Sequence, residues 1–238
     1  MNIAMWSGPR NLSTAMMYSF AARGDCAVWD EPFYAAYLKT TGLTHPMGKE
    51  VIAAGEPDPD RVGAACAGQN PQGQSLFYQK HMTHHMIPGF DRGWMRSVVN
   101  VFLIRHPARV VASYQQKREQ PTLADLGFIQ QADLFDQVAG WLGRPPVVID
   151  SADIRENPQV LLERLCAALG VPFTDRMLHW PAGPKPYDGA WAPHWYNAVH
   201  RSTGFESAEG PLPDLPKGYA QLVDLALPHY ARLRAFAL

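Results

Sequence analysis

Residues 2–23 read NIAMWSGPRNLSTAMMYSFAAR, and this stretch decides the fold class. Residues 3–7 form a short apolar run that is typical of a buried strand, and the turn at 8–12 contains glycine and proline. Residues 13–23 then have helical character up to Gly24, and glycine commonly ends helices. A strand, a turn and a helix in this order make the first half of a β–α–β unit, so the stretch predicts a parallel sheet covered by helices.

The same alternation of strands and helices continues along the chain. Further strands are expected at 26–29, 77–81, 98–104 and 147–149. Further helices are expected at 107–119, 122–143 and 158–169, with starts at Pro107 and at the Thr122-x-x-Asp125 box. Residues 40–75 and 181–217 are rich in Gly and Pro and are expected to form loops that cover the sheet. We therefore predict a single α/β domain over residues 1–238, three-layered and P-loop-like, with a mostly parallel sheet flanked by helices.

Composition excludes several classes of protein. The chain has 238 residues, with 21 Lys and Arg against 22 Asp and Glu, and its formal net charge is −1. Nucleic-acid binders normally carry an excess of basic residues, so this balance argues against a nucleic-acid partner. Any anion is therefore expected to be small and to be held by a few placed residues. Because 47% of the residues are hydrophobic and only 18% are charged, the chain is not disordered.

The sequence also bears on location and on the cysteines. No apolar run approaches the roughly 20 residues that cross a bilayer, so no membrane partner is expected. The first ten residues, MNIAMWSGPR, lack the pattern of a secretory signal, which predicts a cytoplasmic location. The three cysteines, Cys26, Cys66 and Cys166, lie far apart in or beside apolar stretches, so we expect reduced core residues.

The turn after the first strand, SGPRNLST at 7–14, is the first candidate site. In parallel sheets ligands bind at the carboxyl ends of the strands, and a loop that leads into a helix N-terminus presents backbone N–H groups to an anion. Arg10, Ser13 and Thr14 add side-chain donors. The nucleotide-hydrolysing P-loop requires G-x-x-x-x-G-K-[ST], whereas this loop lacks the second Gly and the Lys, which disfavours a Mg²⁺-dependent ATPase or GTPase. An ordinary strand-to-helix turn with Ser13 as N-cap is the alternative.

The second candidate is RHPARVVASY at 105–114. Arg105 ends the most apolar strand, and Ser113 follows about two helical turns into the next helix, so both can face one crevice. A guanidinium fork with a hydroxyl suits a phosphate monoester. The alternative is that Arg105 is a structural ion-pair partner.

Together these segments resemble the sulfotransferases that use 3′-phosphoadenosine 5′-phosphosulfate (PAPS). That family has a first-strand loop of the type P-[KR]-S-G-T-[TS], which corresponds to residues 9–14, and an Arg followed eight residues later by a Ser, as Arg105 and Ser113 are. Residues 151–173, SADIRENPQVLLERLCAALGVPF, are similar to a third, structural segment, so the resemblance covers residues 3–173. In the loop Asn11 and Leu12 replace the common Ser-Gly, and a Leu does not readily take a glycine-only conformation.

The resemblance implies a reaction and a set of binding residues. PAPS is the implied co-substrate, without a metal, and its sulfuryl group passes to a hydroxyl or amine of a small-molecule acceptor. Arg105 and Ser113 would bind the 3′-phosphate, and Arg10 would stabilise the leaving oxygen. The loop residues implied in binding the 5′ end are Gly8, Pro9, Arg10, Asn11, Leu12, Ser13 and Thr14.

The resemblance also implies a catalytic base. A family pattern places a His seven residues before a Pro, and QKHMTHHMIP places His81 seven residues before Pro88. Neutral imidazole suits a general base near pH 7. His84 and His85 are alternatives, and the three histidines have a spacing that a metal site could also use, although no carboxylate ligand accompanies them.

Two further features stay open at this stage. Asp30 and Glu31 follow the second strand, where a carboxylate could orient a substrate amine, pair with Arg10 or serve as a helix-start acid. The aromatic-rich stretch after residue 180 is expected to cover the nucleotide, with Lys185 or Arg201 supplying charge, or to form the wall of an acceptor pocket. The alternatives to a sulfotransferase are a P-loop small-molecule or nucleoside kinase and a non-catalytic nucleotide-binding module. The sequence defines neither the acceptor nor the oligomeric state.

Overall fold

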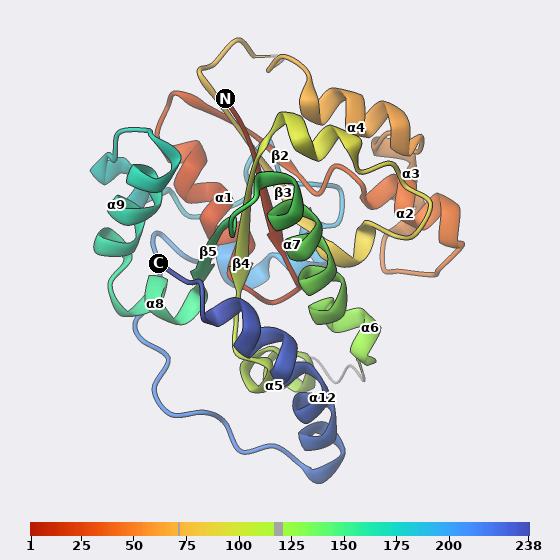
Figure 1. Ribbon diagram of the computed structural model, residues 1–238, viewed down its shortest axis with the longest axis vertical. Coiled ribbons are helices and arrows are strands. Elements are labelled where there is room, and N and C mark those ends of the chain that lie inside the picture. The colour runs from red at the N-terminus through yellow and green to blue at the C-terminus, as the bar shows by residue number, and fades with distance from the viewer. Residues whose placement is uncertain (71, 117–120) are drawn as a thin grey trace.

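A computed structural model describes residues 1–70, 72–116 and 121–238. Five parallel strands form one sheet in the order β2-β3-β1-β4-β5 (Figure 1). The strands are β1 (Asn2–Ser7), β2 (Cys26–Asp30), β3 (Leu76–Met82), β4 (Val99–Ile104) and β5 (Val147–Asp150). The predicted α/β domain with a parallel sheet is therefore confirmed.

Helices cover both faces of the sheet. The α-helices are α1 (Ser13–Ala22), α2 (Tyr34–Thr41), α3 (Gly48–Ala54), α4 (Pro59–Ala67), α5 (Pro107–Gln116), α6 (Leu123–Leu126), α7 (Phe128–Leu142), α8 (Ser151–Glu156), α9 (Pro158–Leu169), α10 (Ala192–Trp195), α11 (Asn197–His200) and α12 (Lys217–Arg234). Three short 3₁₀ turns are η1 (Thr83–His85), η2 (Gly93–Ser97) and η3 (Asp175–Leu178).

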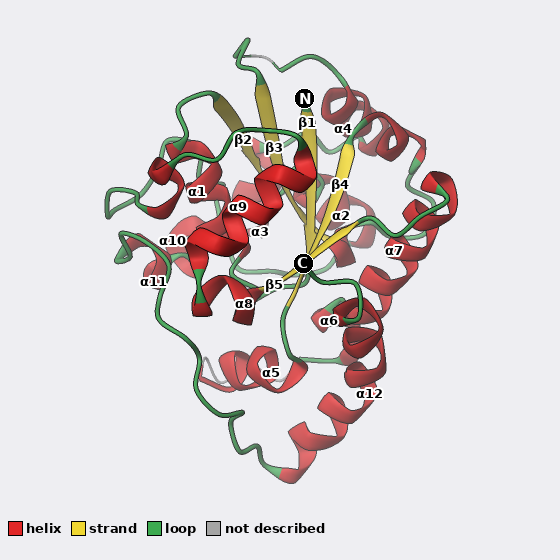
Figure 2. Ribbon diagram, turned by 60° about the vertical axis from the view of Figure 1, so that its left-hand side comes forward, coloured by secondary structure: helices red, strands yellow, loops and turns green. Residues whose placement is uncertain are grey.

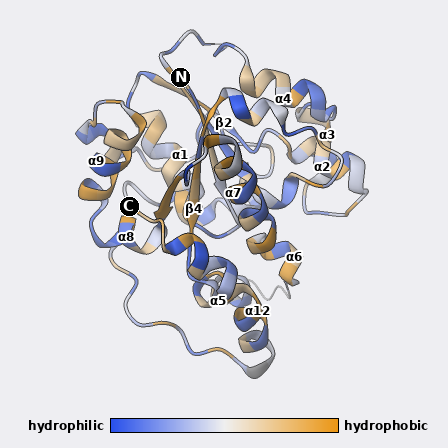
Figure 3. Cartoon of the chain, in the orientation of Figure 1, coloured by the Kyte–Doolittle hydropathy of each residue, from blue (hydrophilic) through white to orange (hydrophobic). Residues whose placement is uncertain are grey.

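Alternation along β1 builds two cores, one on each side of the sheet. Ile3 and Met5 are fully buried in a cluster with side chains of α1 and α9, whereas Ala4 and Trp6 are buried on the other face with side chains of α4 and α7. Figure 2 shows these helices on opposite sides of the sheet. A strand that is covered on both faces is mostly apolar, as β4 is, and β4 is mostly orange in the hydropathy colouring of Figure 3. The neighbouring β3 departs from this pattern, because its buried residues include Gln79, Lys80 and His81.

The register of the sheet brings the chemistry-bearing residues to one edge. Ser7, at the end of β1, pairs with Met82 on β3 and with Leu103 on β4. Asp30, at the end of β2, pairs with Lys80. The loop after β1, Glu31, η1 and Arg105 therefore meet at the carboxyl edge of the sheet, where ligands of such folds bind.

Three stretches differ from the sequence-based expectation. Residues 181–217, expected to be loops, contain the short helices α10 and α11. Residues 40–75, expected to be loops, contain α3 and α4, and Asp58 caps α4 by accepting hydrogen bonds from the N–H groups of residues 60 and 61. The helix expected at 122–143 is two helices, because Gly127 takes a left-handed conformation (φ 72°) between α6 and α7. The Thr122–Asp125 capping box at the start of α6 is confirmed.

The remaining expectations concern the end of one helix, the cysteines and membrane-spanning segments. The helix expected at 107–119 is observed to Gln116, and residues 117–119 lie outside the described part of the chain. Cys26, Cys66 and Cys166 are buried free thiols, as expected of core residues. Among the helices that the structure describes, none combines the length and apolar content needed to span a membrane.

Candidate active site

A cavity of about 1020 Å³ opens at the carboxyl edge of the sheet. Its walls come from the loop after β1, the N-terminal half of α2, η1, α5 and the segment around α10 and α11. Residues 9–14, Arg105 and Ser113, all expected to bind the nucleotide, line this cavity, whereas Gly8 and His81 are not among its described lining residues. The structure therefore collects most of the predicted site residues in one place.

The loop after β1 takes a shape that glycine would normally provide. Leu12 has φ 68° and ψ 9°, and Arg10 has φ 63°, so two non-glycine residues lie in the left-handed region. A left-handed leucine costs on the order of 1–2 kcal/mol, so the loop shape is retained despite the unfavourable residue. Leu12, and not Ser13, is the N-cap of α1, and its side chain makes no capping hydrogen bond. The first N–H groups of α1 are thus uncapped by the N-cap side chain, as an anion site requires.

Gly8 contributes by its lack of a side chain. A Cβ at this position would lie 2.6 Å from the backbone oxygen of Leu126, so only glycine allows the loop to approach the end of α6 this closely. Asn11 anchors the other side, because its buried side-chain amide donates to the carbonyl of Leu103 at 3.3 Å. The loop is therefore held between the sheet and α6.

Arg10, Arg105 and Ser113 lie together, although 95 or more residues separate Arg10 from the other two. Nε of Arg10 donates to the hydroxyl of Ser113 at 3.0 Å, and its Nη2 donates to the Ser113 carbonyl at 3.3 Å. Nη1 of Arg105 donates to the carbonyl of Arg10 at 2.6 Å. The two sequence segments that carry the family resemblance are thus parts of a single site.

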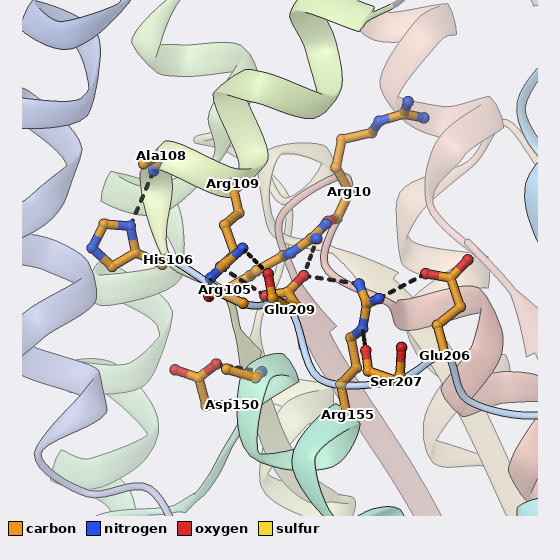
Figure 4. A network of polar contacts seen from close by, with 12 residues as sticks. Arg10, Arg105, His106, Ala108, Arg109, Asp150, Arg155, Glu206, Ser207 and Glu209 are labelled. Atoms are coloured by element: carbon orange, nitrogen blue, oxygen red, sulfur yellow. Dashed lines mark hydrogen bonds and ion pairs between the residues drawn. The ribbon is translucent and has the colours of Figure 1, made fainter. Parts of the chain in front are cut away.

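Two more arginines and one glutamate join Arg105 (Figure 4). The carboxylate of Glu209 pairs with Nη2 of Arg105, with Nε of Arg109 at 2.9 Å and with Nη1 of Arg155 at 3.0 Å. The ion-pair alternative for Arg105 is therefore realised in this conformation. Arg109, Arg155 and Glu209 were not among the site residues predicted from the sequence. The position of Arg109 one turn after Arg105 was the only available signal.

A buried charge cluster lies on the other side of the cavity. Lys80 is 1% exposed, and its Nζ donates to Asp30 at 2.8 Å, to Glu31 at 2.5 Å and to the hydroxyl of Tyr196 at 2.6 Å. Tyr196, from the start of α11, donates its own hydroxyl to Asp30 at 2.7 Å. Asp30 and Glu31 therefore pair with Lys80, a partner that was not among the three roles left open for these acids.

Glu31 combines several properties of a functional carboxylate. Its backbone φ of 42° is unusual for a non-glycine residue, and such strain concentrates at functional sites. Burial raises the pKa of Glu31, although the positive charge of Lys80 opposes this effect. Lys80 holds Oε1, whereas Oε2 lies 4.0 Å from Nδ1 of His85 at the cavity wall. Glu31 is thus a cavity carboxylate that is readier than usual to hold a proton.

His81 does not lie where the resemblance placed a catalytic base. Successive side chains of β3 point to opposite faces of the sheet, so His81 points away from the face to which Lys80 points. His81 is 1% exposed, stacks on Trp6 with ring centroids 4.5 Å apart and contacts Gln79 at 3.2 Å. Burial lowers the pKa of His81 to about 3. In this position His81 cannot touch a substrate in the cavity, which corrects the expectation that it acts as the base.

His84 and His85 do line the cavity. The ring of His85 lies between Tyr34 and Tyr37, with ring centroids 4.6 and 4.8 Å away. Burial lowers the pKa of both histidines, to about 4 for His84. Both rings are therefore neutral near pH 7 and form a wall with the two tyrosines. No group of three His, Cys, Asp or Glu side chains in the described residues is arranged to hold a metal ion.

The aromatic segment after residue 180 forms part of the cavity wall. Asp188 anchors it, because it accepts hydrogen bonds from Tyr18 of α1 at 2.6 Å and faces His200 at 2.9 Å. The N–H of Gly189 donates to Asp30 at 3.0 Å. Trp191 and Arg201 line the cavity, whereas the ammonium group of Lys185 bonds to the carbonyls of residues 181 and 183.

Comparison with known proteins agrees with this geometry. Residues 1–237 match the family model described as Sulfotransferase domain. The chain belongs to the sulfotransferase family. Two curated relatives of this sulfotransferase domain, the branched-chain-amino-acid aminotransferase-like proteins 1 and 2 of Arabidopsis thaliana, are each 36% identical over 98% of the chain. The chain spans 41% of the length of each of these relatives, so their names describe much longer proteins.

One solved structure shares the fold of this sulfotransferase domain. The sulfotransferase domain from the curacin biosynthetic pathway superposes with a TM-score of 0.52 and 17% identity, covering 95% of this chain and 97% of the other. The sulfotransferase domain from the Synechococcus PCC 7002 olefin synthase gives a TM-score of 0.49 at 17% identity, over 94% and 93% of the two chains.

Proposed function

We propose that this sulfotransferase domain transfers a sulfuryl group from PAPS to a hydroxyl or amine of a small-molecule acceptor. The observation that carries the proposal is the convergence of Arg10, Arg105 and Ser113 beside the uncapped N-terminus of α1. A helix N-terminus and guanidinium groups at one end of a large cavity suit a small ligand with several negative charges. The balanced net charge of −1 fits such a local site better than it fits a polyanion surface.

Each donor-side residue has a role in this proposal. The N–H groups of the loop, with Ser13 and Thr14, hold the 5′-phosphosulfate, and Arg105 with Ser113 holds the 3′-phosphate. The acceptor oxygen or nitrogen attacks sulfur in line, the bond from sulfur to the 5′-phosphate oxygen breaks, and the electron pair stays on that oxygen. Arg10 stabilises the charge that develops there. The products are the sulfated acceptor and adenosine 3′,5′-bisphosphate.

Glu31 is the base that the geometry supports best. It lies on the cavity wall, and a raised pKa brings a carboxylate closer to the operating pH, where general-base catalysis is most effective. Lys80 fixes one carboxylate oxygen, so the other is presented in a defined direction. The proton lost by the acceptor passes to this oxygen. His84 and His85 shape the acceptor end of the cavity beside it.

Calorimetric titration with adenosine 3′,5′-bisphosphate, without metal, tests the donor site. We expect binding by the wild type and a loss of about 10- to 100-fold in affinity for Arg105→Ala, since hydrogen bonds to charged groups contribute about 1.5–3 kcal/mol. Arg61→Ala is the matched control, because Arg61 is 75% exposed on α4, away from the cavity. Unchanged affinity in Arg105→Ala refutes the 3′-phosphate site. Equal or tighter binding of Mg²⁺–ATP favours the kinase alternative.

Turnover separates the enzyme from a mere binding module. Labelled PAPS should transfer its sulfuryl group to some member of a panel of alcohols, phenols and amines. If the bisphosphate binds and no acceptor is sulfated, the module alternative gains.

A further inference from the structure

The carboxylate of Glu209 occupies a site that holds more positive charge than one carboxylate can balance. Three arginines from three elements direct guanidinium groups at its carboxylate: Arg105 after β4, Arg109 on α5 and Arg155 on α8 (Figure 4). The Glu209 side chain is 4% exposed. One carboxylate is therefore matched with three cations, whereas a phosphate monoester carries up to two charges and three acceptor oxygens. The site is better suited to a phosphate than to the group that fills it.

Details of the contacts support the same reading. Nε of Arg105 is buried and has no hydrogen-bond partner among the described residues, and Oε2 of Glu209 meets Arg109 as an ion pair without a well-aligned hydrogen bond. Three guanidinium groups and one carboxylate thus leave hydrogen-bonding capacity unused. A buried polar group without a hydrogen-bond partner destabilises the protein. A ligand that offers the arginines more acceptor atoms than the Glu209 carboxylate does would therefore be favoured at this site.

The chain around Glu209 is attached to the domain mainly through these same arginines. Arg109 donates to the carbonyl oxygens of Glu209 and Gly210, and Arg155 donates to the carbonyl of Ser207 at 2.9 Å. Residues 206–214 are exposed, except for Glu209 and Pro213, which are partly buried. A segment with few buried apolar contacts has low local stability, so it can be released at low cost once the arginines take another partner.

We propose that Arg109 and Arg155 join Arg105 and Ser113 in binding the 3′-phosphate of the nucleotide, and that Glu209 competes with that phosphate for the three arginines. This inference rests on the proposed function, since it takes PAPS as the donor. Residues 206–214 form a latch that the incoming phosphate opens by displacing the Glu209 carboxylate. When the product leaves, Glu209 returns to the arginines, which lowers the barrier to product release.

Competition between Glu209 and the phosphate predicts the direction in which ligand affinity changes when the Glu209 charge is removed. A ligand that binds only the open latch has an apparent Kd equal to its intrinsic Kd divided by the fraction of molecules in which the latch is open. Glu209→Gln removes the competing charge and keeps the shape of the side chain. We expect adenosine 3′,5′-bisphosphate to bind Glu209→Gln about tenfold more tightly than it binds the wild type, which corresponds to a latch that is open about a tenth of the time.

Two matched controls isolate the effect. Glu163→Gln removes the same charge from an exposed side chain on α9, which is not among the described residues that line the cavity, so its affinity for the bisphosphate should stay within about twofold of the wild type. Adenosine 5′-monophosphate lacks the 3′-phosphate, so its binding should not tighten in Glu209→Gln.

If Glu209 instead orients the arginines for the phosphate, Glu209→Gln will bind the bisphosphate more weakly, and the inference is overturned while the proposed function stands. Unchanged affinity overturns it as well. If neither wild type nor Glu209→Gln binds the bisphosphate, the proposed donor is refuted, and the latch with it.

A second measurement on the wild type does not depend on how the variant folds. We expect the bisphosphate to increase amide hydrogen exchange in residues 206–210, because the latch opens, while exchange in the loop after β1 decreases. Slower exchange in residues 206–210 contradicts the latch.

Discussion

Replacing Lys80 by methionine tests the buried charge cluster from which Glu31 is presented. Lys80 is 1% exposed and its ammonium group contacts Asp30, Glu31 and Tyr196. Methionine fills a similar volume but leaves two buried carboxylates without their cation. Removing one partner of a buried ion pair costs about 3–5 kcal/mol. At about 2–4 °C per kcal/mol for a chain of this size, the Tm should fall by roughly 6–20 °C.

The loss of stability in Lys80→Met should increase as the pH rises. The positive charge of Lys80 lowers the pKa of Glu31 against the effect of burial, so its removal raises that pKa further. The folded variant then holds a proton that the unfolded chain releases above about pH 4, which makes stability fall as pH rises. The destabilisation should therefore be larger at pH 8 than at pH 5. Adding Glu31→Gln should recover part of the loss, because it removes an unpaired charge.

Thermal unfolding followed by circular dichroism measures the fall in Tm, and urea unfolding at pH 5 and pH 8 measures how the loss of free energy depends on pH. Lys39→Met is the control, because Lys39 is exposed on α2 and should be replaced with little effect. The reasoning fails if Lys80→Met unfolds at the same urea concentration as Lys39→Met. It also fails if the loss is equal at the two pH values.

Two other predictions concern catalysis and the loop. Glu31→Gln should lower kcat by about 10²- to 10⁴-fold while bisphosphate affinity stays unchanged, and because burial raises the pKa of Glu31, wild-type kcat/KM should rise with pH until this base is ionised. His81→Asn should keep the wild-type pH profile of kcat/KM; a flattened profile would restore His81 as the base. Gly8→Ala should cost about 1–3 kcal/mol and weaken bisphosphate binding, since its Cβ would lie 2.6 Å from a backbone oxygen. Gly218→Ala on α12, where a Cβ meets nothing within 4 Å, should leave both quantities near wild type.

The strands and the nucleotide motifs were predictable because their signals are local. Short stretches of three to seven residues marked all five strands to within one residue at each end. The expected helix at 158–169 was observed as α9, since Pro and Gly mark its two ends. Helices α3 and α4 were missed because their segment is rich in glycine and proline, although Asp58-Pro59 is a recognisable helix start.

The orientation of His81 was also within reach of the sequence. A strand at 77–81 alternates its side chains, so Lys80 and His81 must face opposite sides. Spacing to Pro88 alone favoured His81, whereas alternation shows that only one of these two neighbours can face the cavity. The resemblance pointed to β3, which reaches the cavity through Lys80 and Met82, but the side chain of His81 lies on the other side of the sheet.

The sequence by itself determined the alternation of strands and helices, the turn after β1 and the spacing of Arg105 and Ser113, because backbone preferences and short motifs act over about ten residues. Only the tertiary structure decided which charges meet. Lys80 pairs with Asp30 across 50 residues, and Arg105 meets Glu209 across 104. Such pairs leave no periodic trace in the sequence, since they depend on strand order and on where a long covering segment returns to the sheet. The acceptor end of the cavity and the latch over its donor end are therefore properties of the fold.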